Sequence, residues 1–333
     1  MSEPMDRNLA LELVRVTEAA AMAAARFMGR RDKEAADQAA VDAMRYTLHS
    51  VDMDGVVVIG EGEKDEAPML YRGERVGNGT PPAVDVAVDP IDGTMLLANG
   101  RPGAISVVAI AERGSLFFTH LPYMEKMAVG PKARGRIDLT APVRQNLRRI
   151  AEAEGRSVDD LTVVILDRPR HEQLMKEVKE AGARIKLISD GDVAPAIMAA
   201  LEEETGIDAL MGIGGGPEAV VAACALKCLG GDIQGRLWPR DEAERRLVEA
   251  EGHEVEQVLT LDDLCRGQNI FVAVTGITDG ELLRGVRYQG AWARTSSLVM
   301  RSASGTVRWV EAKHDLRRLR EIAGPRYEGA KRP

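Results

Sequence analysis

The sequence predicts an α/β fold of layered helices and sheets, and two observations carry this prediction. Strand-like and helical segments alternate between residues 161 and 229, which is typical of βαβ units in a largely parallel sheet. Short apolar runs early and late in the chain add further strands, so we expect mixed sheets. Because no long linker, low-complexity run or internal repeat interrupts the chain, we expect two packed halves with the site in the cleft between them.

Composition is that of an ordinary globular protein. The chain has 333 residues, of which 45% are hydrophobic and 29% are charged. Such a chain buries roughly 75% of its unfolded surface, so folding requires neither a disulfide nor a structural zinc. The net charge of −8 argues against nucleic acid as the main partner.

Three cysteines and the absence of long apolar runs bear on location. Cys224 and Cys228 lie in an apolar helical run, and with Cys265 we interpret them as core packing. A thiol nucleophile or zinc site is the poorer alternative, because no CxxC pair exists. No run approaches the roughly 18 apolar residues of a membrane span, and residues 1–7 do not have the pattern of a signal peptide. We expect a cytoplasmic protein with no membrane partner.

The individual elements follow from periodicity and from Gly/Pro punctuation. In the first part we expect helices over about residues 5–28 and 34–50 and a loop over 72–82. We expect strands over 55–60, 105–111, 116–119 and 126–129, and a further strand that ends at Asp89. The strands at 105–111, 116–119 and 126–129 are expected to be antiparallel neighbours. In the second part we expect strands over 161–166, 184–188 and 209–213, helices over 172–180, 193–201 and 218–229, and closing strands over 270–275, 295–301 and 306–311.

The most informative segment runs from Val84 to Thr94. An apolar strand is expected to end at Asp89 and to turn sharply at Pro90, which places Asp92 and Thr94 on either side of a glycine. Two carboxylates this close repel each other unless a cation lies between them. The segment is therefore a candidate divalent-metal site with a hydroxyl beside it.

Three further acids could complete such a site. Asp37 shares a helix face with apolar residues, although an acid in the first turns of a helix also suits the helix dipole. Glu61 follows a strand between two glycines, where a solvated acidic turn is the alternative. Glu218 follows Gly216 and Pro217 at a helix start, where free N–H groups suit a phosphate and where the acid could simply satisfy the dipole.

Carboxylates without neighbouring histidines favour a hard cation, Mg²⁺ or Mn²⁺, over zinc. The five histidines are scattered and form no HxxxH pair. Assembled, the acids would hold two or three metal ions, which bind a phosphoryl oxygen and activate water. The set comprises Asp37, Glu61, Asp89, Asp92 and Glu218.

Other turns after strands suit the rest of a substrate. Arg168, Pro169 and Arg170 form a candidate anion clamp, with an exposed basic turn as an equal alternative. Asp190-Gly191-Asp192 could accept hydrogen bonds from sugar hydroxyls or could be an ordinary helix cap. Tyr123 could reach a phosphate or could pack. Because open α/β sheets bind ligands at such strand ends, these turns together describe a sugar bisphosphate.

These motifs resemble those of the class II fructose-1,6-bisphosphatases, a family among the lithium-sensitive sugar and inositol phosphatases. The matching blocks run in order over nearly the whole chain: residues 36–37, 59–63, 65–70, 88–94, 123–126, 168–171, 190–193 and 212–218. One departure is Arg31, where the family pattern Gly-Arg-Gly-Asp-Lys leads us to expect glycine.

The resemblance implies an α/β/α/β/α sugar-phosphatase fold with mixed sheets and assigns roles to residues. The acids named above become metal ligands, and Thr94 becomes the hydroxyl that orients or activates the attacking water. Substrate contacts are implied at Asp92, Gly93, Thr94, Tyr123, Arg168, Pro169, Arg170, Asp190, Gly191, Asp192 and Gly215. We expect one catalytic unit over residues 1–325, with a metal-binding half of about 1–140 and a substrate-binding half of about 141–325, followed by a tail over 326–333.

The expected activity is Mg²⁺- or Mn²⁺-dependent hydrolysis of the 1-phosphate of fructose 1,6-bisphosphate in gluconeogenesis, by a homodimer or homotetramer. Sedoheptulose 1,7-bisphosphate is an alternative or second substrate. An inositol monophosphatase is less favoured, since the two arginines argue for two phosphates. A non-catalytic regulator that binds sugar phosphates is disfavoured by the retention of every carboxylate and of Thr94.

Overall fold

The computed structural model describes residues 9–61 and 70–323, and the chain divides into two compact units. The first unit comprises residues 1–115 and 268–333, and the second comprises residues 116–267. This division differs from the expected halves of about 1–140 and 141–325, because the strand at 271–276 pairs with the strand at 105–112 and draws the C-terminal part into the first unit. The expected tail, 326–333, lies outside the described residues.

The first unit contains a mixed sheet. In the described residues its strand order is β12-β13-β11-β4-β3-β1-β2, with β14 paired to β13. β1 and β3 run parallel, and every other neighbouring pair in this sheet is antiparallel. The strands are β1 (Asp54–Ile59), β2 (Arg75–Val76), β3 (Ala83–Asp92), β4 (Ile105–Glu112), β11 (Phe271–Gly276), β12 (Arg287–Gln289), β13 (Trp292–Arg301) and β14 (Thr306–Asp315).

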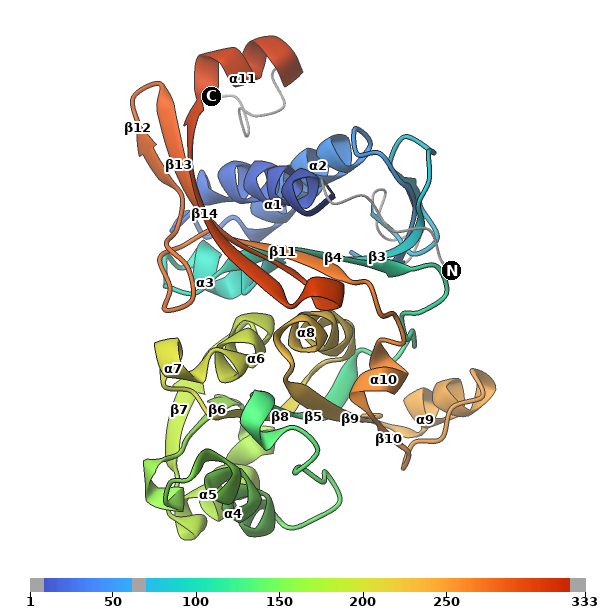
Figure 1. The fold of residues 1–333 in the computed structure, drawn as a ribbon, viewed down its shortest axis with the longest axis vertical. Helices are drawn as coiled ribbons and strands as arrows, with labels where there is room; N and C mark the ends of the chain where they lie inside the picture. Colours follow the sequence, from blue (N-terminus) through green and yellow to red (C-terminus); the bar gives the residue numbers. More distant parts are fainter. Residues whose placement is uncertain (1–8, 62–69, 324–333) are drawn as a thin grey trace. The chain divides into compact units, whose positions relative to one another are not determined.

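Helices α1 (Leu9–Ala25) and α2 (Lys33–Leu48) pack against each other over this sheet (Figure 1). The expected apolar face of α2 is buried at Val41, Met44 and Leu48. Asp32 caps α2, since its carboxylate accepts a hydrogen bond from the Ala35 amide at 3.1 Å. Two further helices, α3 (Thr94–Ala98) and α11 (Leu316–Ala323), and a 3₁₀ turn, η4 (Ser302–Ser304), belong to the same unit.

The second unit contains a six-stranded sheet in the described residues, in the order β10-β9-β5-β8-β6-β7. Only β6 with β7 and β6 with β8 are parallel pairs; the other neighbours are antiparallel. The strands are β5 (Tyr123–Val129), β6 (Thr162–Leu166), β7 (Arg184–Ile188), β8 (Ala209–Gly215), β9 (Asp232–Leu237) and β10 (Val258–Leu259).

Helices cover both faces of this second sheet, with α4 and α5 on one face and α6 and α8 on the other (Figure 1). The longer helices are α4 (Val143–Glu154), α5 (Glu172–Ala181), α6 (Val193–Ala200), α8 (Gly216–Leu229) and α9 (Glu242–Ala250). Shorter turns are α7 (Glu202–Thr205), α10 (Leu261–Leu264), η1 (Pro131–Ala133), η2 (Val158–Asp160) and η3 (Pro169–His171).

The predicted α/β class with mixed sheets is confirmed, and so are most of the expected elements. The strand expected over 116–119 is wrong, because only an isolated bridge joins Leu116 to Cys265 there. The expected antiparallel neighbourhood of 105–111 and 126–129 is also wrong, since β4 and β5 belong to different sheets. The alternation between residues 161 and 229 yields three mutually parallel strands, β6, β7 and β8, and β5 enters the same sheet between β8 and β9 in the opposite direction.

The cysteines are confirmed as core residues. Cys224, Cys228 and Cys265 are free and buried, and the Sγ atoms of Cys224 and Cys265 lie 3.6 Å apart. In the described part of the chain, no helix combines the length and apolarity needed to cross a bilayer.

Candidate active site

Strand β3 ends in a bulge that presents two of the predicted metal ligands. Asp89 pairs with Val107 and Asp92 pairs with Ile105, so β3 carries one extra residue between these positions. Pro90 falls within this irregularity, where its missing N–H need not break the ladder. The expectation that the strand ends at Asp89 is therefore wrong, because the bulge carries pairing on to Asp92.

The groups after this bulge are packed tightly. Asp92 is only 3% exposed, and the Ile91 amide donates to Asp89 Oδ1 at 3.0 Å. Gly93 then adopts φ 88°, a left-handed conformation that a residue with a side chain rarely adopts. Thr94 begins α3, and its hydroxyl donates to the Ile91 carbonyl at 3.2 Å, which leaves the oxygen lone pairs able to accept a hydrogen bond.

Asp37 and Glu61 lie on elements that adjoin β3. Asp37 is half-buried on α2, which packs against β3 and α3. Ile59 of β1 pairs in parallel with Ala87 of β3, so Glu61, just after β1, and Asp89, in β3, are each two residues further on toward the same end of the sheet. Glu61 is exposed, and its amide donates to the Leu70 carbonyl at 3.1 Å.

These four acids belong to the first unit, whereas Glu218 belongs to the second. Among residues 9–61 and 70–323, no three His, Cys, Asp or Glu side chains are gathered closely enough to hold one metal ion. The chemistry of the donors nevertheless fits a hard divalent cation, since all five are carboxylates.

In the second unit the predicted substrate residues lie at one edge of the sheet. The parallel strands β6, β7 and β8 end there, and the antiparallel strand β5 begins there, with Tyr123 opposite Gly215. The Arg168–Arg170 turn follows β6, the Asp190–Asp192 turn follows β7, and Glu218 follows β8. The structure thus brings these residues to the ligand-binding end of an α/β sheet.

The two arginines of the expected clamp have different partners. Arg170 Nη2 donates to the Ile213 carbonyl at 2.8 Å, and its guanidinium lies 5.2 Å from the Tyr123 ring centroid. Arg168 Nη2 lies 3.8 Å from Asp190 Oδ1. Arg240, at the start of the segment leading into α9, lies 5.3 Å from the same tyrosine ring. Three guanidinium groups therefore lie near the Tyr123 and Asp190 side chains.

A buried charge cluster lies beside this clamp. Lys126 Nζ lies 2.8 Å from Asp192 Oδ2 and donates to the Gly215 carbonyl at 2.9 Å. Glu218 Oε2 is inaccessible and has no hydrogen-bond partner among the described residues. Burial, reinforced by the Asp192 carboxylate, raises the pKa of Glu218, and Lys126 opposes that rise. An unpartnered buried carboxylate oxygen is a group that a bound cation would satisfy.

His171 joins two of these strand ends. Its Nδ1 lies 2.7 Å from the Leu166 carbonyl, and the Ile213 amide donates to its Nε2 at 2.7 Å. Both contacts are satisfied only by the neutral imidazole protonated on Nδ1. Burial lowers the pKa of His171, and the Arg170 and Arg168 charges lower it further.

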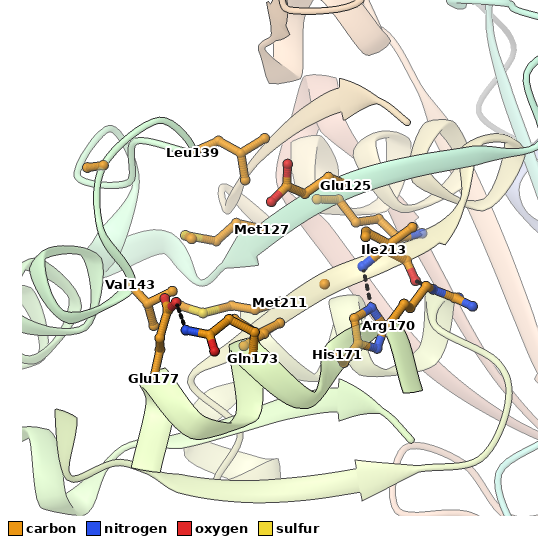
Figure 2. Close-up of a pocket in the computed structure, with 14 residues that line it drawn as sticks. Glu125, Met127, Leu139, Val143, Arg170, His171, Gln173, Glu177, Met211 and Ile213 are labelled. Atoms are coloured by element: carbon orange, nitrogen blue, oxygen red, sulfur yellow. Dashed lines mark hydrogen bonds between the residues drawn. The ribbon is translucent and has the colours of Figure 1, made fainter. Parts of the chain in front are cut away.

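A cavity of about 240 Å³ lies on the α4 and α5 face of the second sheet. Figure 2 shows Arg170 and His171 toward one end of it and Glu177 and Val143 toward the other. Of the predicted substrate residues, only Arg170 lines this cavity. The remaining ones do not, so the cavity does not coincide with the candidate site.

Sequence reasoning missed the roles of Lys126, His171 and Arg240. Lys126 had a detectable signal, because it stands between Met124 and Ala128 on an otherwise apolar face of its strand. A lysine at such a position needs a buried partner. Arg240 follows β9, a strand that the sequence analysis did not predict, and carried no comparable signal.

Comparisons with known proteins agree on one family. Residues 7–314 match the family described as bacterial fructose-1,6-bisphosphatase, glpX-encoded. A D-fructose 1,6-bisphosphatase class 2/sedoheptulose 1,7-bisphosphatase of Synechococcus sp. (strain JA-3-3Ab) is 47% identical over 335 residues, which cover 93% of this chain and 96% of the relative. A fructose-1,6-bisphosphatase class 2 of Haemophilus influenzae is 47% identical over 331 residues, covering 96% and 99%.

A phosphoric monoester hydrolase needs groups that bind metal ions, water and phosphate. The chain has such groups: carboxylates and a hydroxyl at the end of β3, and guanidinium groups and a glycine-rich turn in the second unit. The comparisons assign the chain to that class of enzyme. The chain belongs to the family of bacterial class II fructose-1,6-bisphosphatases. Membership implies a requirement for a divalent metal and a sugar bisphosphate as substrate. The resemblance stated from the sequence motifs is confirmed.

Proposed function

We propose that this chain removes the 1-phosphate of fructose 1,6-bisphosphate, giving fructose 6-phosphate and inorganic phosphate, as a step of gluconeogenesis. The observation that carries the proposal is the presence of two distinct sets of phosphate-binding groups in a member of this family. Asp89 and Asp92 lie in the last part of β3 and Thr94 begins α3, and these three residues are assigned to the phosphate that is cleaved. Arg168 and Arg170 follow β6, and they are assigned to the phosphate that stays on the sugar.

The metal part of the proposal is that Mg²⁺ or Mn²⁺ ions bind the carboxylates of Asp37, Glu61, Asp89, Asp92 and Glu218. Bound divalent ions polarise phosphoryl oxygens and lower the pKa of water, which is the chemistry the reaction requires. Two observations support this donor set: all five groups are hard oxygen donors, and the Glu218 Oε2 atom is buried without a hydrogen-bond partner among the described residues.

The other residues are assigned to orientation and binding. The Thr94 hydroxyl, which already donates to Ile91, accepts a hydrogen bond from the attacking water and aligns it with phosphorus. Gly93 allows the backbone to approach the phosphate. Asp190, Gly191 and Asp192 receive the sugar hydroxyls, while Tyr123, Pro169 and the Gly215 backbone complete the contacts with the phosphate ends of the substrate.

A second substrate, sedoheptulose 1,7-bisphosphate, is favoured by a specific observation. Two Synechococcus relatives, 47% and 46% identical to this chain, carry names that include sedoheptulose 1,7-bisphosphatase. The arginine clamp binds a terminal phosphate and does not contact the carbon chain of the sugar in this proposal, so it is compatible with both bisphosphates. Inositol monophosphate offers only one phosphate and leaves the clamp unused.

The proposal also includes a homodimer or homotetramer in the cytoplasm. Family resemblance in the sequence motifs supports this assembly, and size-exclusion chromatography with light scattering tests it directly. A monomeric mass at assay concentration would contradict the proposed assembly without bearing on the chemistry.

Phosphate release tests the proposed activity. The purified full chain is incubated with fructose 1,6-bisphosphate, sedoheptulose 1,7-bisphosphate or inositol monophosphate, each with Mn²⁺, with Mg²⁺, or with chelator and no metal. We expect metal-dependent release from the fructose substrate, with or without release from the sedoheptulose substrate. No release from either bisphosphate under any metal condition would overturn the proposal.

A further inference from the structure

We infer that Lys126 is a positioning residue of the substrate site, which holds the Asp192 carboxylate and the end of strand β8 in one fixed arrangement. This inference rests on the proposed function, because Asp192 and Gly215 are substrate contacts only within that proposal. Lys126 itself need not touch the substrate. Its effect is transmitted through the two oxygens that it binds.

The geometry of Lys126 is that of an internal brace. The residue is 2% exposed, and its ammonium group lies 2.8 Å from Asp192 Oδ2 and 2.9 Å from the Gly215 carbonyl oxygen. These two oxygens come from different segments, the turn after β7 and the last residue of β8. The buried ammonium group of Lys126 therefore fixes the distance between the turn after β7, which is assigned to the sugar, and the end of β8, which is assigned to a phosphate.

Gly214 and Gly215, at the end of β8, leave space for the side chains of Lys126, Asp192 and Glu218. A Cβ atom at position 214 would lie 1.8 Å from Asp192 Oδ2 and 2.9 Å from Lys126 Cε. A Cβ atom at position 215 would lie 1.6 Å from Glu218 Oε2. Gly214 and Gly215 thus serve the packing of charged side chains, in addition to any close approach of backbone to a ligand.

Charge explains why a lysine is needed here. Lys126 faces a set of carboxylates, since Asp192 lies in contact and both Asp190 and Asp192 interact electrostatically with Glu218. Without the ammonium group, Asp192 would be a buried anion facing other anions, which is costly and would repel an incoming phosphate. Loss of Lys126 should therefore weaken substrate binding more than it slows the chemical step.

The test is the substitution Lys126→Met, which keeps the length and apolar stem of the side chain and removes the charge. We expect KM for fructose 1,6-bisphosphate to rise at least about tenfold, with kcat of the folded enzyme changed less than about threefold. Circular dichroism and thermal melting establish how much of the variant is folded at the assay temperature. An unchanged KM in folded Lys126→Met would overturn the inference.

The matched control is Lys227→Met. Lys227 is also largely buried, and its ammonium group bridges Asp262 Oδ1 at 2.6 Å and the Cys265 carbonyl at 2.8 Å, near the other end of α8. It loses the same kinds of contact, but it holds no residue that is assigned to the substrate. Lys227→Met should lower the melting temperature without raising KM. If KM rises as much in Lys227→Met as in Lys126→Met, the rise in Lys126→Met reflects general destabilisation, and the positioning role is overturned.

Two further arms keep the outcome decisive. If Lys126→Met does not fold, Lys126→Gln retains a hydrogen-bond donor without the charge, and its KM should still rise, by about fivefold; no rise would overturn the inference.

Wild-type enzyme measured in parallel separates the two proposals. An inactive wild type removes the proposed function, whereas an active wild type with unaffected Lys126 variants removes only the positioning role.

Discussion

Thr94 is the residue on which the proposed chemistry depends most directly. The left-handed Gly93 turns the chain after the β3 bulge, so Thr94 starts α3 directly after the segment that carries Asp89 and Asp92. Its hydroxyl donates to the Ile91 carbonyl, which fixes the position of the oxygen and leaves its lone pairs available.

Thr94→Ala should therefore lower kcat by about 10²–10⁴-fold with little change in KM, since water orientation acts in the transition state. Thr94→Ser, which keeps the hydroxyl, should recover most of the loss. Steady-state kinetics on fructose 1,6-bisphosphate measure both variants. Turnover of Thr94→Ala near that of the wild type would remove the role assigned to this residue.

Arg31 stands where the sequence analysis expected glycine, and its backbone has a conformation that favours glycine. Its φ is 58°, in the left-handed region where glycine is the favoured residue. The Arg31 amide donates to the Ala98 carbonyl at 3.0 Å, which ties the segment before α2 to the end of α3 and keeps the strained conformation in place.

Restoring glycine should relieve this strain. We expect Arg31→Gly to raise the free energy of unfolding by roughly 0.5–1 kcal/mol. This is the cost of the left-handed conformation for arginine minus the cost of the greater conformational entropy of glycine in the unfolded chain. The neighbouring Arg30, which does not have a positive φ, supplies the control, and Arg30→Gly should destabilise instead. Urea unfolding measures both, and an Arg31→Gly variant less stable than the wild type would contradict the strain argument.

At the scale of elements, His171 connects the turn after β6 to strand β8. The imidazole receives the Ile213 amide on Nε2 and contacts the Leu166 carbonyl through Nδ1, so protonation of Nε2 would remove one of the two bonds. Arg170, the adjacent clamp residue, is bound to the same Ile213 through its carbonyl. The clamp and the glycine-rich strand end are thus held by one neutral histidine.

The sign of the pH effect follows from the direction of the pKa shift. Burial lowers the pKa of His171 below its ordinary value of 6.5, so the unfolded chain binds a proton at a pH where the folded protein does not. The stabilising contribution is present in full above the ordinary pKa and is lost as pH falls below it toward the folded-state pKa.

His171→Phe should therefore lower the free energy of unfolding at neutral pH and reduce the loss of stability that occurs as the pH falls below about 6.5. Urea unfolding at a series of pH values gives the slope of stability against pH for the variant and for the wild type. A His171→Phe slope identical to that of the wild type would show that His171 does not titrate as the structure implies.

Elements were predictable where local pattern decides them. The apolar face of α2 and the glycine- and proline-bounded strands β7 and β8 carry their periodicity in a few consecutive residues. The β3 bulge at Pro90 could not be predicted, because it depends on pairing with β4, which only the folded sheet supplies. Strand β9 was missed for a similar reason, since Gly235 and charged residues such as Arg236 interrupt its apolar pattern.

At the scale of the whole molecule, the sequence predicted the class, the order of the motifs and the family, and it did not predict how the chain divides. The first unit takes its closing strands from the C-terminal part, because β11 pairs between β4 and β13. The carboxylates and Thr94 around β3 and the clamp around β6 and β8 come from separate sheets. Buried groups such as Lys126 were also missed, because their partners are set by long-range packing rather than by motif spacing.

The central claim is that the enzyme attacks the phosphorus of the 1-phosphate of fructose 1,6-bisphosphate. The direct measurement is phosphorus NMR of the products formed by the full chain with Mn²⁺ in heavy-oxygen water. We predict fructose 6-phosphate as the remaining sugar phosphate and one heavy oxygen in the released inorganic phosphate. Fructose 1-phosphate as the product, or inorganic phosphate that carries no heavy oxygen, would contradict the claim.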